Sequence, residues 1–126
     1  MDPNRSSAAA RSVLLFVEDD GLGELFDEAL SDAGHLVTRA RDDDELRRAL
    51  LRQRFDSVIV DLDDRARRPA VTLAQLRAAA PATAVVALLP CSAGLDGRSL
   101  GYDAALEKPA RLAALLAAVQ TRRNVQ

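Results

Sequence analysis

SVIVDLDDRARRP, at residues 57–69, changes character abruptly after its first apolar residues. The opening SVIV is short and rich in β-branched side chains, which is typical of a strand buried on both faces. Acids and arginines follow at once, beginning with Asp61. Acids at such a place act as turn formers, helix caps, metal ligands or nucleophiles. The rest of the chain has to decide among these roles.

Similar apolar runs recur along the chain and alternate with helical patterns. The predicted strands cover residues 12–17, 35–40, 57–60, 84–89 and 104–107. The predicted helices lie within residues 23–34, 42–55, 71–80 and 110–120. Such alternation predicts an α/β fold, with a parallel sheet covered by helices on both faces.

Residues 90–103 interrupt this alternation. They contain a proline, three glycines and several turn formers, so we expect any fourth helix at this point to be short or irregular. The whole chain of 126 residues suits one domain. We predict a flexible lead at residues 1–10, a domain at 11–121 and a polar tail at 122–126.

Composition excludes several classes of protein. With 17 basic and 19 acidic residues, the net charge of −2 gives no broad reason to expect direct nucleic-acid binding. The single cysteine, Cys91, cannot form an internal disulfide, and no zinc-ligand spacing accompanies it. Neither a signal peptide nor an apolar span is apparent, so we expect a cytoplasmic protein without membrane contact.

Acids and a lysine stand where three of the predicted strands end. Glu18 and Asp19 follow the first strand, Asp61 follows the third, and Lys108 follows the fifth. If the first and third strands are neighbours, the three acids converge in one cleft, and their repulsion favours a bound divalent cation such as Mg²⁺. A lysine at the same edge could pair with Asp61 and later with a phosphoryl oxygen.

FVEDD, VIVDLD and YDAALEKP, in this order and spacing, resemble the receiver domain of two-component response regulators. The resemblance spans about residues 11–120. It implies a flavodoxin-like, doubly wound sheet of five strands in the order 2-1-3-4-5. It also implies a phosphoryl group accepted from a histidine kinase or phosphotransfer protein, with no activity beyond self-phosphorylation and autodephosphorylation.

The same resemblance assigns roles to single residues. Asp61 would be the phosphoacceptor, and Lys108 would contact the phosphate. Mg²⁺ would be held by Glu18, Asp19, Asp61 and the backbone carbonyl of Asp63.

Several positions depart from the family pattern, two of them in its signal relay. Leu89 stands where a serine or threonine usually turns its hydroxyl toward the phosphate, and Ala105 stands where a switching aromatic ring is usual. Leucine has no hydrogen-bonding group. We therefore expect an atypical output surface, and a pseudo-receiver that binds partners without phosphorylation is the alternative.

Two further alternatives concern the acids. Asp61 could simply cap the next helix, as we expect Asp20 to cap the first and residues 42–44 to open the second. The motif also resembles the nucleophile motif of haloacid-dehalogenase-type phosphatases, with Asp61 and Asp63 as the reacting pair. That motif usually stands near the start of a chain, whereas sixty residues precede Asp61 here.

Partners follow from the single predicted domain. We expect the signal to leave through protein contact, with a target that the sequence does not name. The apolar LAALLAAVQ near the C-terminus also suits a homodimer face. We interpret His35 as a surface residue. Tyr102 precedes the fifth predicted strand and does not occupy the position of the switching aromatic ring.

Overall fold

The computed structural model describes residues 10–62, 68–90 and 101–123. Within these ranges, five strands and four helices alternate, except that β5 follows β4 with no helix assigned between them. The short or irregular helix that we predict at 90–103 falls largely on residues 91–100, outside the described residues.

All strands pair in parallel in one sheet of order β2-β1-β3-β4-β5, which confirms the predicted topology. Their bounds lie close to those predicted. They are β1 (Ser12–Phe16), β2 (Leu36–Ala40), β3 (Ser57–Asp61), β4 (Ala84–Leu89) and β5 (Ala104–Glu107).

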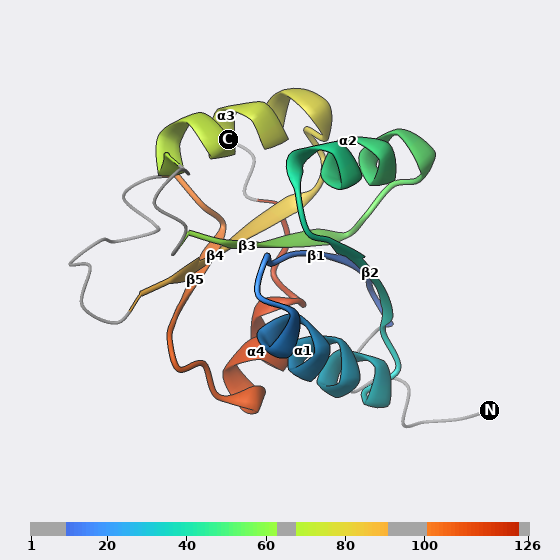
Figure 1. The fold of residues 1–126 in the computed structure, drawn as a ribbon, viewed down its shortest axis with the longest axis vertical. Coiled ribbons are helices and arrows are strands. Elements are labelled where there is room, and N and C mark those ends of the chain that lie inside the picture. Colours follow the sequence, from blue (N-terminus) through green and yellow to red (C-terminus); the bar gives the residue numbers. More distant parts are fainter. Residues whose placement is uncertain (1–9, 63–67, 91–100, 124–126) are drawn as a thin grey trace.

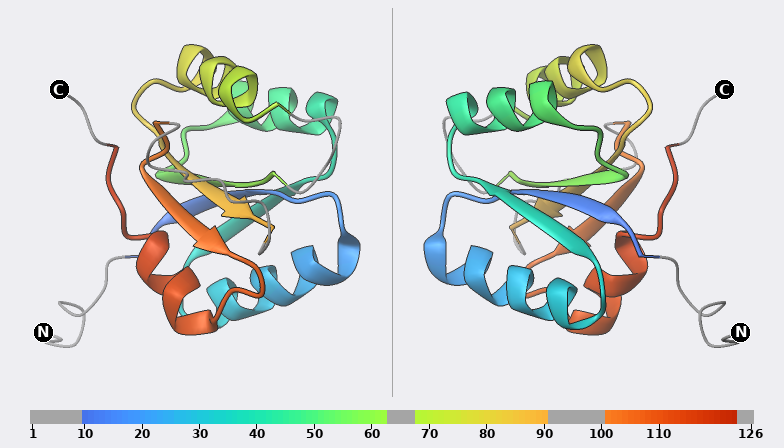
Figure 2. Two further views of the ribbon diagram at one scale, coloured as in Figure 1. Left: turned by 90° about the vertical axis from the view of Figure 1, so that its left-hand side faces the viewer. Right: turned by 90° about the vertical axis from the view of Figure 1, so that its right-hand side faces the viewer.

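Helices cover both faces of this sheet (Figure 1). One face carries α2 (Asp43–Arg52) and α3 (Pro69–Ala79), and the other carries α1 (Asp20–Asp32) and α4 (Leu112–Ala118). The edge-on views in Figure 2 show the resulting three layers. Within the described ranges no helix is both long and apolar enough to cross a membrane.

The core explains why β3 and β4 read as continuous apolar runs. Every residue of both strands is buried, because helices cover both of their faces. Val58 and Val60 pack toward α2 and α3, whereas Ile59 packs toward α1 and α4. The alternation of side chains along a strand thus supplies two aliphatic cores from one sheet.

Two expectations near α1 prove wrong. The helix is capped by Asp19, whose side chain accepts hydrogen bonds from the backbone of Gly21 and Leu22, and Asp20 is already helical. His35 is buried, with 7% of its surface exposed, and its Nδ1 accepts a hydrogen bond from the backbone N–H of Arg11. The helix α1 ends just before Gly34, as predicted, and the φ of 96° at this residue favours glycine.

Candidate functional site

Asp61 lies at the carboxyl edge of the sheet as the last residue of β3. Because β3 has β1 on one side and β4 on the other, its backbone is held from both directions. Asp61 is opposite Leu88 of β4, and only 8% of its surface is exposed. The carboxylate is therefore fixed by the centre of the sheet rather than by a loop.

Lys108 reaches Asp61 from the end of β5. Its Nζ lies 3.0 Å from Oδ1 and 3.1 Å from Oδ2 of Asp61. The side chains of lysine and aspartate are 23% and 11% exposed, respectively. The backbone N–H of Lys108 donates to the carbonyl oxygen of Leu89 at 2.8 Å, which extends the pairing of β4 with β5 to this residue. Sheet pairing thus brings together two charges that are 47 residues apart in the chain.

Glu18 and Asp19 lie beyond the end of β1, where the neighbouring strand carries Asp61. Both are exposed. The Oδ1 atom of Asp19 accepts from the N–H of Gly21 at 2.9 Å and of Leu22 at 3.3 Å, and thereby caps α1. Asp19 thus has a structural role that the sequence interpretation assigned to Asp20.

The carboxylates offer oxygen ligands of the kind that Mg²⁺ prefers. Among the residues that the structure describes, however, no group of three His, Cys, Asp or Glu side chains is arranged to hold a metal ion. The Oδ2 atom of Asp19 is not used by the cap, and Glu18 faces solvent. Asp63, the fourth predicted ligand, lies outside the described residues. The donor chemistry fits a divalent cation, and the ligand set stays a prediction.

Asp20, the third acid after β1, pairs with cations instead. The Nε of Arg41 lies 3.0 Å from its Oδ1, and Nη2 of Arg39 lies 3.4 Å from the same atom. Both arginines belong to β2 or follow it directly. Because these arginines offset the charge of Asp20, Glu18 and Asp19 are the two acids after β1 that are more open to a ligand.

Leu89 and Ala105 occupy two of the positions at which the sequence departs from the receiver pattern. Leu89 ends β4, is 4% exposed and packs with the α2 and α3 side of the core. Ala105 lies in β5, partly buried against the same cluster. An aliphatic side chain and a methyl group therefore occupy these two places.

The sequence interpretation missed the buried polar contacts at Tyr102 and Asp103. The hydroxyl of Tyr102 donates to the carbonyl oxygen of Pro69 at 2.6 Å, and Oδ2 of Asp103 accepts from the backbone N–H of Val85 at 2.8 Å. A similar aromatic-acid pair, Phe55 and Asp56, precedes β3.

This pair behaves in the same way, since Oδ2 of Asp56 accepts from the backbone N–H of Ser12 at 2.8 Å. An aromatic residue followed by aspartate, directly before an apolar run, is the signal that would have found both contacts. In each pair the ring is buried and the carboxylate ties down a neighbouring strand.

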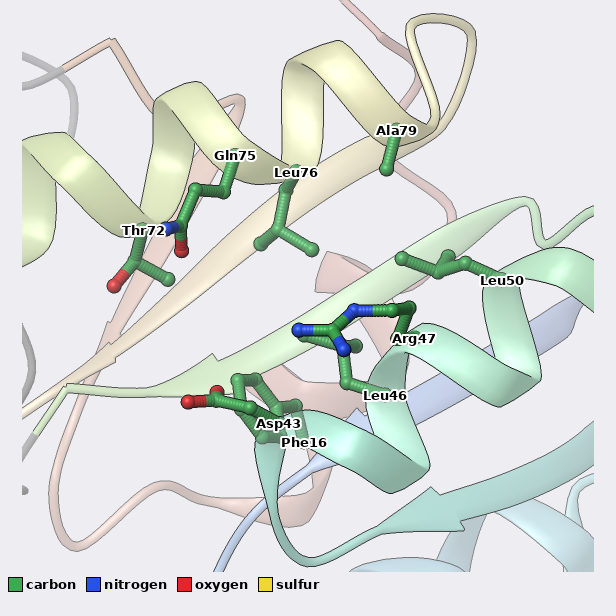
Figure 3. A pocket seen from close by; sticks show the side chains of 9 residues that line it. All are labelled: Phe16, Asp43, Leu46, Arg47, Leu50, Thr72, Gln75, Leu76 and Ala79. Atoms are coloured by element: carbon green, nitrogen blue, oxygen red, sulfur yellow. The ribbon is translucent and has the colours of Figure 1, made fainter.

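A groove of about 250 Å³ separates α2 from α3 on the same face of the sheet (Figure 3). Its floor and walls are mainly apolar, and Figure 3 shows the side chain of Gln75 directed along it toward Thr72. None of the predicted site residues lines this groove.

No protein-family model matches the chain, and no curated protein sequence matches it. Solved structures do match. Chemotaxis response regulator CheY4 of Vibrio cholerae superposes with a TM-score of 0.74 at 22% identity, over 89% of this chain and 98% of that one.

Two further structures contain ions. The receiver domain of sensor histidine kinase PA1611 from Pseudomonas aeruginosa, with magnesium in its active site cleft, gives a TM-score of 0.74 at 23% identity, covering 89% of this chain and 96% of that one. A Burkholderia pseudomallei response regulator, with a phosphorylated aspartic acid, calcium and citrate, gives a TM-score of 0.73 at 23% identity. The match covers 88% of this chain and 67% of that one. In the order of its strands and the placing of its helices, this chain has the fold of the response regulator receiver domain.

Proposed function

We propose that the chain is an atypical receiver that accepts a phosphoryl group on Asp61. The observation that carries this proposal is the ion pair between Asp61, held by the centre of the sheet, and Lys108 at the carboxyl edge. In doubly wound folds this is the edge at which ligands bind. A mostly buried carboxylate with an ammonium group beside it is suited to act as a nucleophile.

The donor would be a phosphohistidine of a histidine kinase or phosphotransfer protein. An oxygen of Asp61 attacks phosphorus, the P–N bond breaks, and its electron pair stays on the imidazole nitrogen, which then takes up a proton. Hydrolysis removes the phosphoryl group from Asp61. Water attacks phosphorus, the carboxylate leaves, and inorganic phosphate is released together with the proton from water. We expect no enzymatic activity beyond these two reactions.

Lys108 would remain at the site throughout. Its ammonium group neutralises Asp61 before transfer and can pair with a phosphoryl oxygen afterwards, as a compact charge on a flexible stem allows. Mg²⁺ would reduce the repulsion between the phosphoryl oxygens and the carboxylates, with Glu18, Asp19, Asp61 and the Asp63 carbonyl as its protein ligands.

Phosphorylation can be tested with a small phosphodonor. The protein is incubated with Mg²⁺ and acetyl phosphate, and intact mass is followed with time. We expect a gain of one phosphoryl group that is lost on hydrolysis and absent from Asp61→Asn. Beryllium fluoride provides a second measurement, because it should perturb the backbone NMR signals around Asp61 and Lys108 without covalent transfer.

A pseudo-receiver is the second candidate, and Leu89 is the observation that favours it. Its buried aliphatic side chain offers no hydroxyl group to a phosphoryl oxygen. If neither a mass gain nor a fluoride-dependent change is found, the pseudo-receiver is the better description. Output would then depend on protein contact alone.

A further inference from the structure

A basic cleft opens at the amino edge of the sheet, opposite the edge that carries Asp61. It has a volume of about 900 Å³ and is lined by residues that directly precede β1, β3 and β4, together with the end of the described chain. We call it the amino-edge cleft. Its charged lining consists of Arg11, Arg54, Arg122 and Arg123, with Asp56 as the one acid.

The charge of the amino-edge cleft is available to a ligand. Asp56 already accepts the N–H of Ser12. Arg54 and Arg122 are exposed, and within the described ranges neither side chain forms a hydrogen bond or ion pair. A protein with a net charge of −2 thus concentrates positive charge at one place.

Two other arginines are anchored within the cleft. Nη2 of Arg11 donates to the carbonyl oxygen of Thr121 at 3.3 Å. Nε of Arg123 donates to that of Pro81 at 3.2 Å, and its Nη1 lies 3.8 Å from Oδ1 of the buried Asp103, so the charge open to a ligand is mainly that of Arg54 and Arg122. The Nε of Arg11 is buried and has no hydrogen-bond partner. A buried donor without a partner is costly, and an anion in the cleft is one means of supplying it.

The amino-edge cleft adjoins the groove between α2 and α3. Leu50 and Ala79 line both, and Figure 3 shows these two side chains facing each other across one end of the groove. Gln75 and Thr72 lie deeper in the groove, and no side-chain hydrogen bond is made by either within the described part of the chain. A slot lined by apolar side chains and by Asp43, Arg47, Thr72 and Gln75 therefore leads into a basic cleft.

We propose that the amino-edge cleft and the groove together bind a nucleotide. The phosphates would pair with the arginines, whose guanidinium groups match phosphate geometry. The base would enter between α2 and α3, where apolar walls exclude water and Gln75 and Thr72 offer hydrogen bonds. Four of the nine lining side chains are polar or charged, so the lining favours a base over a lipid tail.

Binding can be measured by fluorescence polarisation with ribose-labelled ATP and GTP in EDTA, which removes divalent cations from the opposite edge. We expect saturable binding that weakens at least about tenfold in the double variant Arg54→Gln, Arg122→Gln, because two charge-assisted contacts are lost. Gln75→Ala should reduce the difference in affinity between ATP and GTP. Asp61→Asn should bind as tightly as the wild type, which separates this proposal from the proposed phosphorylation.

Arg111→Gln is the matched control, since Arg111 is exposed and lies outside the cleft and the groove, directly before α4. It should leave the affinity unchanged, and an equal loss in this variant would overturn the proposal in favour of diffuse charge attraction. Tripolyphosphate, dodecyl phosphate and a single-stranded oligonucleotide serve as competitors. Competition by any of them as strong as that by the unlabelled nucleotide would overturn the assignment of a nucleotide, as would the absence of saturable binding.

Discussion

Asp103 and Arg77 form a buried ion pair that ties the start of β5 to the last turn of α3. Nη1 of Arg77 lies 2.9 Å from Oδ2 of Asp103, whose side chain is 1% exposed. The same guanidinium donates through Nη2 to the carbonyl oxygen of Gly101 at 2.8 Å. One arginine therefore holds both the carboxylate and the backbone that leads into β5, the strand that ends beside Lys108.

Replacement of Arg77 by methionine should lower the free energy of unfolding by about 1–3 kcal/mol, because the buried Asp103 loses its nearer cation and keeps Arg123, whose Nη1 lies 3.8 Å from Oδ1. Urea denaturation followed by circular dichroism measures the loss. Arg47→Met is the matched control, since Arg47 and Asp44 are 3.7 Å apart and their side chains are 71% and 73% exposed. This control should cost only about 0–1 kcal/mol, and equal losses in the two variants would contradict the assigned importance of burial.

Lys108→Met should destabilise the protein by about 1–3 kcal/mol, because the mostly buried Asp61 loses its hydrogen-bonding cation. Adding Asp61→Asn should restore part of that stability, since the carboxylate charge that the lysine offset is removed. A double-mutant cycle from urea denaturation gives the coupling energy. A double variant as unstable as Lys108→Met alone would show that the lysine contributes through packing rather than through its charge.

Variants of Asp19 separate its cap from its predicted role as a metal ligand. Asp19→Ala should cost about 1 kcal/mol, because the N–H groups of Gly21 and Leu22 lose their acceptor. Asp19→Asn retains an acceptor oxygen and should unfold like the wild type, yet it should bind Mg²⁺ more weakly. Isothermal titration with Mg²⁺ checks the second part, and unchanged affinity in Asp19→Asn would remove Asp19 from the ligand set.

His35 should make stability depend on pH. Burial, and then the nearby charge of Arg11, lower the pKa of His35 below its usual 6.5. Below pH 6.5, His35 binds a proton more readily in the unfolded chain than in the folded one. Stability that is present above pH 6.5 is therefore lost as the pH falls toward the folded pKa.

His35→Asn is the control, because its side-chain oxygen can replace Nδ1 as acceptor for Arg11 without titrating. The difference in unfolding free energy between the two proteins should shrink or change sign with falling pH, and a constant difference would exclude the effect. As His35 is the single histidine of the chain, its pKa can also be read directly by NMR.

Much of the fold could be predicted because its signals are local. Continuous apolar runs such as VIV and AVVALL indicate strands covered on both faces, and acids before residues 43–52 indicate a helix start. Both Asp61 and Lys108 could be placed at one edge from strand ends alone. The distance between their side chains could not be predicted, since it depends on β3, β4 and β5 lying side by side.

The amino-acid sequence by itself determined the alternation of strands and helices, the parallel sheet, and the edge to which the acids and the lysine belong, because periodicity and strand ends are properties of neighbouring residues. Only the tertiary structure decided that His35 is buried and that Asp103 is held by Arg77. These outcomes depend on which groups remain without a partner once the elements pack. A carboxylate or an imidazole binds whatever donor the fold places beside it, and that donor is often far away in the chain.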